Sequence, residues 1–261
     1  MKPVIKYQGG KSKELPLIKE LLPKQFERVV EPFCGGAAVS FGLGYPALLS
    51  DINKSVINLY QVIADSDQYP TLQRRVDEIK GYDHDMLQEE YYKARDIINT
   101  GGDPYTSALS FIIMRQLCFS GMERYNANGE FNVPFGHYKR FSCNLSPDHH
   151  NFLKKCDIRF TSFDDTLSSV KEGDFIFLDP PYLDRLGYSE GDGGYALHSK
   201  LYGILSTVTV PWMIIHSDHE FYREYYKDFN IIEKDFAYAQ RFGKDKDHSG
   251  AKVKHLYVTN Y

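Results

Sequence analysis

Residues 28–53 read RVVEPFCGGAAVSFGLGYPALLSDIN and give the strongest indication of the fold. A short apolar run leads into a glycine-rich turn, and the residues after the turn have the composition of a helix. A second apolar run then ends at an acid, Asp51. This order of strand, glycine-rich turn, helix and strand with a terminal acid is typical of the first half of a doubly wound nucleotide-binding fold, in which ligands bind at the carboxyl ends of the strands.

The rest of the chain divides by its pattern into a strand-rich part and a helix-rich part. Amphipathic spacing predicts helices in five places: residues 14–22, 55–65, 71–82, 86–100 and 105–119. Asn128-Gly129 lies between two β-prone runs and predicts a β-hairpin. Strand patterns resume afterwards at residues 157–163, 174–182 and 211–218, and residues 231–240 and 254–261 are expected to form a closing antiparallel pair. We therefore expect an α/β catalytic domain, residues 1–54 and 151–261, with a helical insert that includes the hairpin, residues 55–150.

Composition limits the classes of function. The chain has 261 residues and a formal net charge of −4, so any contact with nucleic acid must come from a local basic surface. The 20 Tyr and 17 Phe supply core residues and also rings on which bases can stack. No apolar run has the length of a signal peptide or a membrane span, which favours a cytoplasmic protein.

Cysteine and histidine spacing does not indicate a metal site. Cys34, Cys118, Cys143 and Cys156 lack the C-x-x-C spacing of a zinc site, and we expect reduced, mostly buried thiols. His149-His150 is interpreted as an exposed pair at the start of a helix rather than as a pair of ligands.

The segment Tyr7-Gln8-Gly9-Gly10-Lys11-Ser12 resembles the end of a phosphate-binding loop. The pattern G-x-x-x-x-G-K-[ST] requires a glycine five residues before Gly10, where this chain has Ile5. The loop is therefore expected to bind a ligand other than a nucleoside triphosphate.

Two further segments have the chemistry of a cofactor site. In EPFCGG, residues 31–36, the glycines would let the backbone approach a ligand, and Glu31 is suited to accept from an ammonium group. Asp51, at the end of the next strand, is placed to accept from ribose hydroxyls. A tight turn without a ligand is the alternative interpretation of this segment.

The stretch DFIFLDPPYL, residues 174–183, indicates the reaction. Prolines have no N–H, so the peptide at Pro180-Pro181 offers acceptors only, the Asp179 carboxylate and a neighbouring carbonyl, and these two fixed acceptors match the two N–H groups of an exocyclic amine. Tyr182 offers a ring face to a planar base. The alternative is a strand end at which the prolines stop the strand and Asp179 only caps the next segment; together with the glycine-rich turn, we favour the functional interpretation.

The chain resembles the Dam-like family of DNA adenine-N6 methyltransferases over essentially its whole length. The resemblance lies in the order of its motifs: KYQGGK, EPFCGG, an acid after the second strand, a central insert and a late DPPY. The resemblance implies a Rossmann-like sheet that binds S-adenosylmethionine and a target-recognition insert. It also implies double-stranded DNA as substrate, no metal, a monomer in solution, and methyl transfer to N6 of a flipped adenine, with G-A-T-C as the leading target. In this mechanism Asp179 and the Pro180 carbonyl accept the two N6 hydrogens.

The resemblance also implies site residues. The catalytic residues are Asp179, Pro180, Pro181 and Tyr182. The implied cofactor contacts are Tyr7, Gly9, Gly10, Lys11, Glu31, Phe33, Cys34, Gly35, Gly36, Asp51, Ser162, Phe163, Asp164 and Asp179, of which residues 162–164 match the family loosely. The implied DNA contacts are Arg95, Met122, Arg124, Asn126, Pro134, Lys139, Arg140 and Tyr188.

Two other functions fit parts of the pattern. A methylase of protein amides, amines or RNA more often has Asn in place of Asp179 and lacks KYQGGK and the hairpin. A DNA-binding protein that has kept the methylase fold without its activity would not need KYQGGK, EPFCGG and DPPY together.

Overall fold

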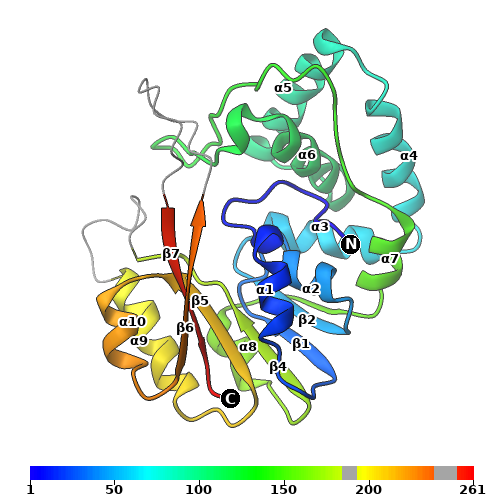
Figure 1. Ribbon diagram of the computed structural model, residues 1–261. Helices are drawn as coiled ribbons and strands as arrows, with labels where there is room; N and C mark the ends of the chain where they lie inside the picture. Colours follow the sequence, from blue (N-terminus) through cyan, green and yellow to red (C-terminus); the bar gives the residue numbers. More distant parts are fainter. Residues whose placement is uncertain (184–192, 238–251) are drawn as a thin grey trace. The chain divides into compact units, whose positions relative to one another are not determined.

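The computed structural model describes residues 1–183, 193–237 and 252–261 (Figure 1). These residues form two compact units, of which the first comprises residues 1–22 and 34–162 and the second residues 23–33 and 163–261. The strands of the described residues have the sheet order β3-β2-β1-β4-β5-β7-β6 and are mostly parallel. The protein is therefore a mixed α/β fold, as the sequence predicts.

The first unit is mainly helical. Its elements are η1 (Lys11–Lys13), α1 (Leu15–Glu20), α2 (Ala38–Leu43), β2 (Ala47–Asp51), α3 (Lys54–Ala64), α4 (Tyr69–Ile79), α5 (His84–Thr100), α6 (Pro104–Leu117), η2 (Phe119–Gly121), α7 (Pro147–Leu153) and β3 (Asp157–Phe160). Strands β2 and β3 pair in parallel, with Asp51 opposite Phe160. The helices predicted from amphipathic spacing are confirmed to within a few residues.

Side-chain caps explain where the long helices begin. Asn53, Asp83 and Asp103 each accept a hydrogen bond from a backbone N–H in the first turn of α3, α5 and α6. Helix α6 packs against both α3 and α5 and is buried over nearly its whole second half. The helical bundle is therefore built around α6.

The chain reverses at Asn128-Gly129, as predicted. Asn126 Oδ1 accepts from the backbone N–H groups of Asn128, at 3.0 Å, and Glu130, at 2.9 Å, and Gly129 adopts a φ of 80°. The flanking residues are joined by isolated antiparallel bridges, between Cys118 and Phe135 and between Tyr125 and Phe131. A regular two-stranded hairpin therefore remains a prediction.

The second unit contains most of the sheet. Its elements are β1 (Arg28–Glu31), α8 (Phe163–Ser168), β4 (Asp174–Leu178), α9 (Gly193–Leu205), β5 (Trp212–Ser217), α10 (Glu220–Tyr225), β6 (Asn230–Ala237) and β7 (Lys252–Thr259). Strands β1, β4 and β5 are parallel, whereas β7 is antiparallel to both β5 and β6. The predicted antiparallel pair near the end of the sequence is confirmed, and β6 and β7 are the orange and red arrows of Figure 1.

A buried ion pair sets the register of β1 against β4. Arg28 Nε donates to Asp174 Oδ1 at 2.8 Å and Arg28 Nη2 donates to Asp174 Oδ2 at 2.7 Å. The Asp174 side chain is only 1% exposed, so the two-point contact satisfies a carboxylate that water does not reach. Strands β4 and β5 are buried along their whole length, which explains their continuous apolar sequences.

Some sequence-based expectations have clear outcomes. His149 is buried rather than exposed, and its Nε2 lies 2.8 Å from the Lys2 carbonyl oxygen, so the interpretation as a surface pair is wrong for this residue. All four cysteines are reduced, and three are buried. Among the described residues, no helix is long and apolar enough to cross a membrane. The compact units reflect packing, and the functional division into a catalytic domain and an insert stays a prediction.

Candidate active site

In the first unit, the N-terminal loop packs directly on the glycine-rich turn. A Cβ atom at Gly35 would lie 2.7 Å from Tyr7 Cε1, and one at Gly36 would lie 2.9 Å from Tyr7 Cβ. Gly35 also adopts a φ of 43°, in the left-handed region that favours glycine. The structure therefore brings together the predicted residues Tyr7, Gly35 and Gly36, and the glycines are needed for contact with the Tyr7 ring.

The KYQGGK loop is a compact turn that is held by its own groups. Gly9 has a φ of 75°, and the Gly10 N–H donates to the Tyr7 carbonyl at 3.3 Å. The Lys11 side chain is buried, and its Nζ donates to the Gly9 carbonyl at 2.8 Å. The predicted residues Gly9, Gly10 and Lys11 thus lie in one turn with Tyr7.

Asp51 connects the end of β2 to the glycine-rich turn. Its Oδ2 accepts from the Gly35 N–H and its Oδ1 accepts from the Asn53 N–H, each at 2.8 Å. Burial raises the pKa of the Asp51 carboxyl, and these backbone hydrogen bonds oppose that rise. On the other side of the turn, the buried Tyr60 hydroxyl donates to the Gly35 carbonyl at 2.7 Å. Asp51 therefore orients the turn, in addition to any contact with a ligand.

Arg115 is part of this cluster, although it was not among the predicted site residues. It lies in α6 and is 0% exposed, and its guanidinium carbon is 5.4 Å from the centre of the Tyr7 ring. Its Nε donates to the Lys6 carbonyl at 2.9 Å and its Nη1 donates to Glu123 Oε2 at 3.0 Å. The Arg115 side chain therefore links the N-terminal loop to Glu123, which directly precedes Arg124. A single basic residue within the apolar run SFIIMRQL is the sequence signal that indicates it.

In the second unit, the DPPY segment directly follows the buried strand β4. Asp179 is half-buried and Pro180 is buried. The Tyr182 ring packs against His216, with the ring centres 4.7 Å apart, and meets His255 edge-on at 5.5 Å. The four predicted catalytic residues therefore lie at the carboxyl end of a parallel strand, where α/β sheets bind their ligands.

Several predicted cofactor residues of the second unit also have defined neighbours. Glu31 is buried at the end of β1. The rings of Phe33 and Phe163 are stacked, with centres 5.3 Å apart and an interplanar angle of 24°. Asp164 forms an ion pair with Lys200, whose Nζ also lies 5.7 Å from the Phe163 ring centre. The predicted residues Ser162 and Cys34 belong to the first unit, where Ser162 is partly buried and Cys34 is buried.

The predicted DNA contacts lie mainly in the segment that follows α6. Arg124 is exposed, and its Nε donates to Asn132 Oδ1 at 2.8 Å. Arg95 lies in α5 with its guanidinium 4.7 Å from the Tyr92 ring centre. The remaining predicted contacts in this part are the partly buried Met122 and Asn126 and the exposed Pro134, Lys139 and Arg140. Tyr188 lies outside the described residues.

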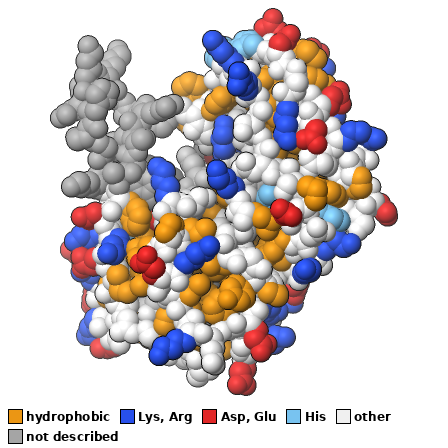
Figure 2. All heavy atoms as spheres, turned by 45° about the vertical axis from the view of Figure 1, so that its right-hand side comes forward, with side chains coloured by type: hydrophobic (Ala, Val, Ile, Leu, Met, Phe, Trp, Pro, Cys, Tyr) orange, Lys and Arg blue, Asp and Glu red, His pale blue; other side chains and the backbone are white. Residues whose placement is uncertain are grey.

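Charged side chains do not gather into one basic surface on the face shown in Figure 2. There, Lys and Arg alternate with acidic and hydrophobic side chains, as the net charge of −4 leads one to expect.

Comparison with known proteins identifies the family. Residues 7–240 match the D12 class of N6 adenine-specific DNA methyltransferases. The type II methyltransferase M.CviBI of Paramecium bursaria Chlorella virus NC1A is 31% identical over 269 residues, which cover all of both chains. The type II methyltransferase M.MjaIII of Methanocaldococcus jannaschii is 31% identical over 88% of this chain and 90% of its own. The DNA adenine methylase of Escherichia coli strain K12 is 33% identical over 68% of this chain and 64% of its own.

The chain therefore belongs to the D12 class of N6-adenine-specific DNA methyltransferases. This finding confirms the resemblance and the enzyme class predicted from the sequence, and it displaces the alternatives of a protein or RNA methylase and of an inactive DNA-binding protein. Membership of the family implies S-adenosylmethionine as methyl donor and DNA as substrate.

Proposed function

We propose that the protein transfers a methyl group from S-adenosylmethionine to N6 of an adenine that has left the DNA duplex, and that the DPPY segment holds this adenine. The observation that supports the proposal is the position of Asp179 and Pro180 directly after the buried strand β4. A buried strand gives these two acceptors a rigid support, and consecutive prolines leave no N–H donor between them.

The described residues suit S-adenosylmethionine by their chemistry. Glu31 matches the ammonium group of its methionine part, Lys11 matches the carboxylate, and Asp51 matches the ribose hydroxyls. Two of these groups already lie where other contacts hold them in place, because Lys11 is bonded to its own turn and Asp51 to the glycine-rich turn. Bound S-adenosylmethionine would supply a methyl group attached to a positively charged sulfur.

Ile52 is a further candidate for cofactor contact that the sequence analysis missed. It follows Asp51 directly and is 77% exposed, which is unusual for a large apolar side chain. An apolar surface next to the ribose position suits the adenine ring of the cofactor. A bulky apolar residue after the acid of the second strand is the sequence signal for this role.

The proposed catalysis consists of orientation and hydrogen bonding by this chain. The Asp179 carboxylate and the Pro180 carbonyl accept the two hydrogens of N6, which favours a pyramidal nitrogen whose lone pair points away from the ring. Placement of the nitrogen at about 3–3.5 Å from the methyl carbon contributes several kcal/mol through orientation. Extrusion of the base costs a few kcal/mol, and the Tyr182 ring offers a surface on which the extruded adenine can stack.

Replacement of Asp179 by Ala tests the proposed catalytic segment. The variant should lose methyl transfer to unmethylated DNA, while it still folds and binds DNA, because a contact of the transition state is removed. Asp228→Ala changes an exposed acid of the same unit and is the matched control. Turnover of Asp179→Ala close to that of the parent would contradict the mechanism.

Cofactor binding has its own test. Calorimetry should show weaker binding of S-adenosylmethionine to Asp51→Ala, which loses a ribose partner, and to Lys11→Ala, which loses the partner of the carboxylate. Lys13→Ala removes an exposed ammonium two residues away and should bind like the parent. Unchanged affinity in both Asp51→Ala and Lys11→Ala would refute the assignment.

The target sequence that we propose is G-A-T-C, on the resemblance of the residues around Asn128-Gly129 to the DNA-contacting segment of the family. Sequencing of methylated positions in unmethylated DNA treated with the enzyme identifies the target directly. A 2-aminopurine in place of the target adenine should brighten on binding if the base is extruded. Verified binding without a change in fluorescence would contradict extrusion.

A further inference from the structure

Two buried histidines contact the backbone directly after the proposed catalytic residues. His198 lies in α9 and is 2% exposed, and His216 lies in β5 and is 0% exposed. His198 Nε2 is 3.0 Å from the Pro181 carbonyl oxygen. His216 Nε2 is 3.0 Å from the Leu183 amide nitrogen. The two rings therefore hold the backbone on both sides of Tyr182.

The partners of His216 determine which nitrogen has the hydrogen. A backbone N–H can only donate, so His216 Nε2 must accept from Leu183. A carbonyl can only accept, and His216 Nδ1 lies 2.8 Å from the Ser217 carbonyl oxygen, so Nδ1 has the hydrogen. Protonation of Nε2 would place two N–H groups against each other, so His216 must be neutral to make this contact.

His198 has the opposite tautomer. Its Nε2 faces the Pro181 carbonyl and must donate, and its Nδ1 lies 2.7 Å from the Tyr222 hydroxyl. In the neutral ring, Nδ1 accepts from that hydroxyl. Burial lowers the pKa of His198 to about 4 and the pKa of His216 to about 3, so both rings are neutral at physiological pH.

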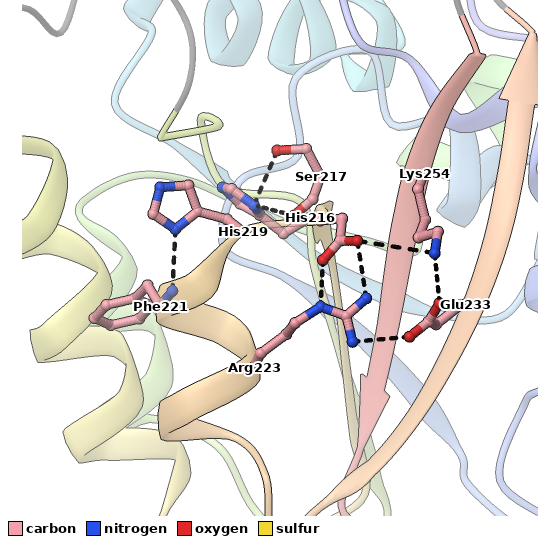
Figure 3. Close-up of polar contacts among 8 residues, drawn as sticks. His216, Ser217, His219, Phe221, Arg223, Glu233 and Lys254 are labelled. Atoms are coloured by element: carbon pink, nitrogen blue, oxygen red, sulfur yellow. Dashed lines mark hydrogen bonds and ion pairs between the residues drawn. The ribbon is translucent and has the colours of Figure 1, made fainter.

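Aromatic packing restricts rotation of the two rings. His216 is stacked on Tyr222, with ring centres 4.2 Å apart, and meets His198 edge-on at 5.2 Å. Beyond Ser217, Arg223 binds both Asp218 and Glu233, and Lys254 binds Glu233 at 2.8 Å, as the close-up in Figure 3 shows. The aromatic contacts hold the His216 ring, and the ion pairs join α10, β6 and β7 to the residue that follows β5.

The two prolines explain why external support is needed. Pro180 and Pro181 have no N–H, so neither can donate a backbone hydrogen bond that would anchor the segment to the rest of the chain. The histidines supply bonds from two other elements, one to the carbonyl of Pro181 and one to the N–H of Leu183. These two bonds then help to hold the direction of the backbone that includes the Pro180 carbonyl.

We infer that His198 and His216 are positioning residues for methyl transfer: neutral imidazoles of opposite tautomer that clamp the DPPY backbone so that its two acceptors face the N6 hydrogens of adenine. This inference rests on the proposed catalytic role of Asp179 and Pro180. Neither histidine exchanges a proton with the substrate, and each acts through the backbone that it holds.

Paired substitutions separate positioning from simple packing. In Gln, the end of the side chain lies near the position of Nε2, whereas Asn reaches only the position of Nδ1. His198→Gln and His216→Gln should therefore keep kcat within about 3-fold of the parent, whereas His198→Asn and His216→Asn should lower kcat by about 10–100-fold, since a displacement of about 1 Å at a reacting group has effects of this size. Affinities for DNA and S-adenosylmethionine should stay within about 2-fold in every folded variant, because the binding contacts are untouched.

Two further measurements decide the outcome if an Asn variant does not fold. Tyr222→Phe keeps the stacked ring but removes the hydroxyl that selects the tautomer of His198, so it should fold and lower kcat by at least about 3-fold. Nitrogen NMR of histidine-labelled protein should show the hydrogen on Nδ1 of His216 and on Nε2 of His198. Parent kcat in Tyr222→Phe, or the reverse tautomers, would overturn the inference.

Asp179→Ala, measured in the same series, separates failure of this inference from failure of the proposed function. If Asp179→Ala keeps its turnover, the catalytic segment itself is wrongly assigned. If Asp179→Ala is inactive while folded Asn variants of both histidines keep the parent kcat, the catalytic segment stands and the positioning role is refuted.

Discussion

Replacement of Gly35 by Ala is the sharpest test of the contact between the N-terminal loop and the glycine-rich turn. The new Cβ would lie 2.7 Å from Tyr7 Cε1 and 3.0 Å from Tyr7 Cδ1. The Tyr7 ring has little room to retreat, because its own Cβ lies against Gly36 and the Arg115 guanidinium lies 5.4 Å from the ring centre. The substitution also places an Ala at a φ of 43°.

Two costs add up in this variant. The left-handed conformation costs about 1–2 kcal/mol for a residue with a Cβ. Displacement of the Tyr7 ring costs about 1–3 kcal/mol more, as in other overpacked sites. We expect Gly35→Ala to lower the free energy of unfolding by about 2–5 kcal/mol in total. Gly44→Ala is the matched control, because Gly44 has a φ of 78° but no atom within 4 Å of the added Cβ, so only the first cost applies.

Urea unfolding of both variants measures these free energies, and calorimetry measures the affinity for S-adenosylmethionine, which should fall in Gly35→Ala and stay unchanged in Gly44→Ala. In a double-mutant cycle, the cost of Gly35→Ala should be about 1–3 kcal/mol smaller when Tyr7 is replaced by Ala. Equal losses of stability in Gly35→Ala and Gly44→Ala, or a cost of Gly35→Ala that does not depend on Tyr7, would refute the proposed contact.

Three other predictions concern stability and target choice. Lowering the pH from 7 to 5 should reduce the free energy of unfolding by about 4 kcal/mol. The pKa values of buried His198 and His216 lie at about 4 and about 3, below the value of about 6.5 in the unfolded chain, so the unfolded chain binds more protons as the pH falls. A free energy of unfolding, measured with urea, that does not change between these pH values would contradict this. Arg28→Met should destabilise the protein by about 3 kcal/mol, since it leaves the 1% exposed Asp174 carboxylate without its charged partner, and a loss below about 1 kcal/mol would show that the ion pair is dispensable. Arg124→Ala should relax the preference at one base of the target by about 1–3 kcal/mol if Arg124 contacts a base, whereas equal weakening on all sequences with a salt slope lower by about one unit would show a phosphate contact instead.

Local sequence pattern was sufficient for the class of fold and for the enzyme family. Apolar runs that end at a glycine- or proline-containing turn, or at an acid, predicted the strands β1, β2 and β4, because burial and turn formation depend on residues close in sequence. The order of KYQGGK, EPFCGG and DPPY predicted an adenine-N6 DNA methyltransferase, and the family comparison confirms it. Each motif can be recognised from the sequence alone, because it consists of adjacent residues.

The tertiary structure alone decided which distant residues support the motifs. His198 and His216 are separated from Asp179 by 19 and 37 positions, and no spacing rule links them to the DPPY segment, yet they lie within hydrogen-bond distance of its backbone. Arg115 contacts the N-terminal loop more than 100 positions away, and His149 is buried where the sequence suggested exposure. Such contacts depend on how helices and strands pack. Burial keeps a histidine neutral and requires an arginine to be paired, and in both cases the hydrogen-bond partners then fix the geometry of the side chain.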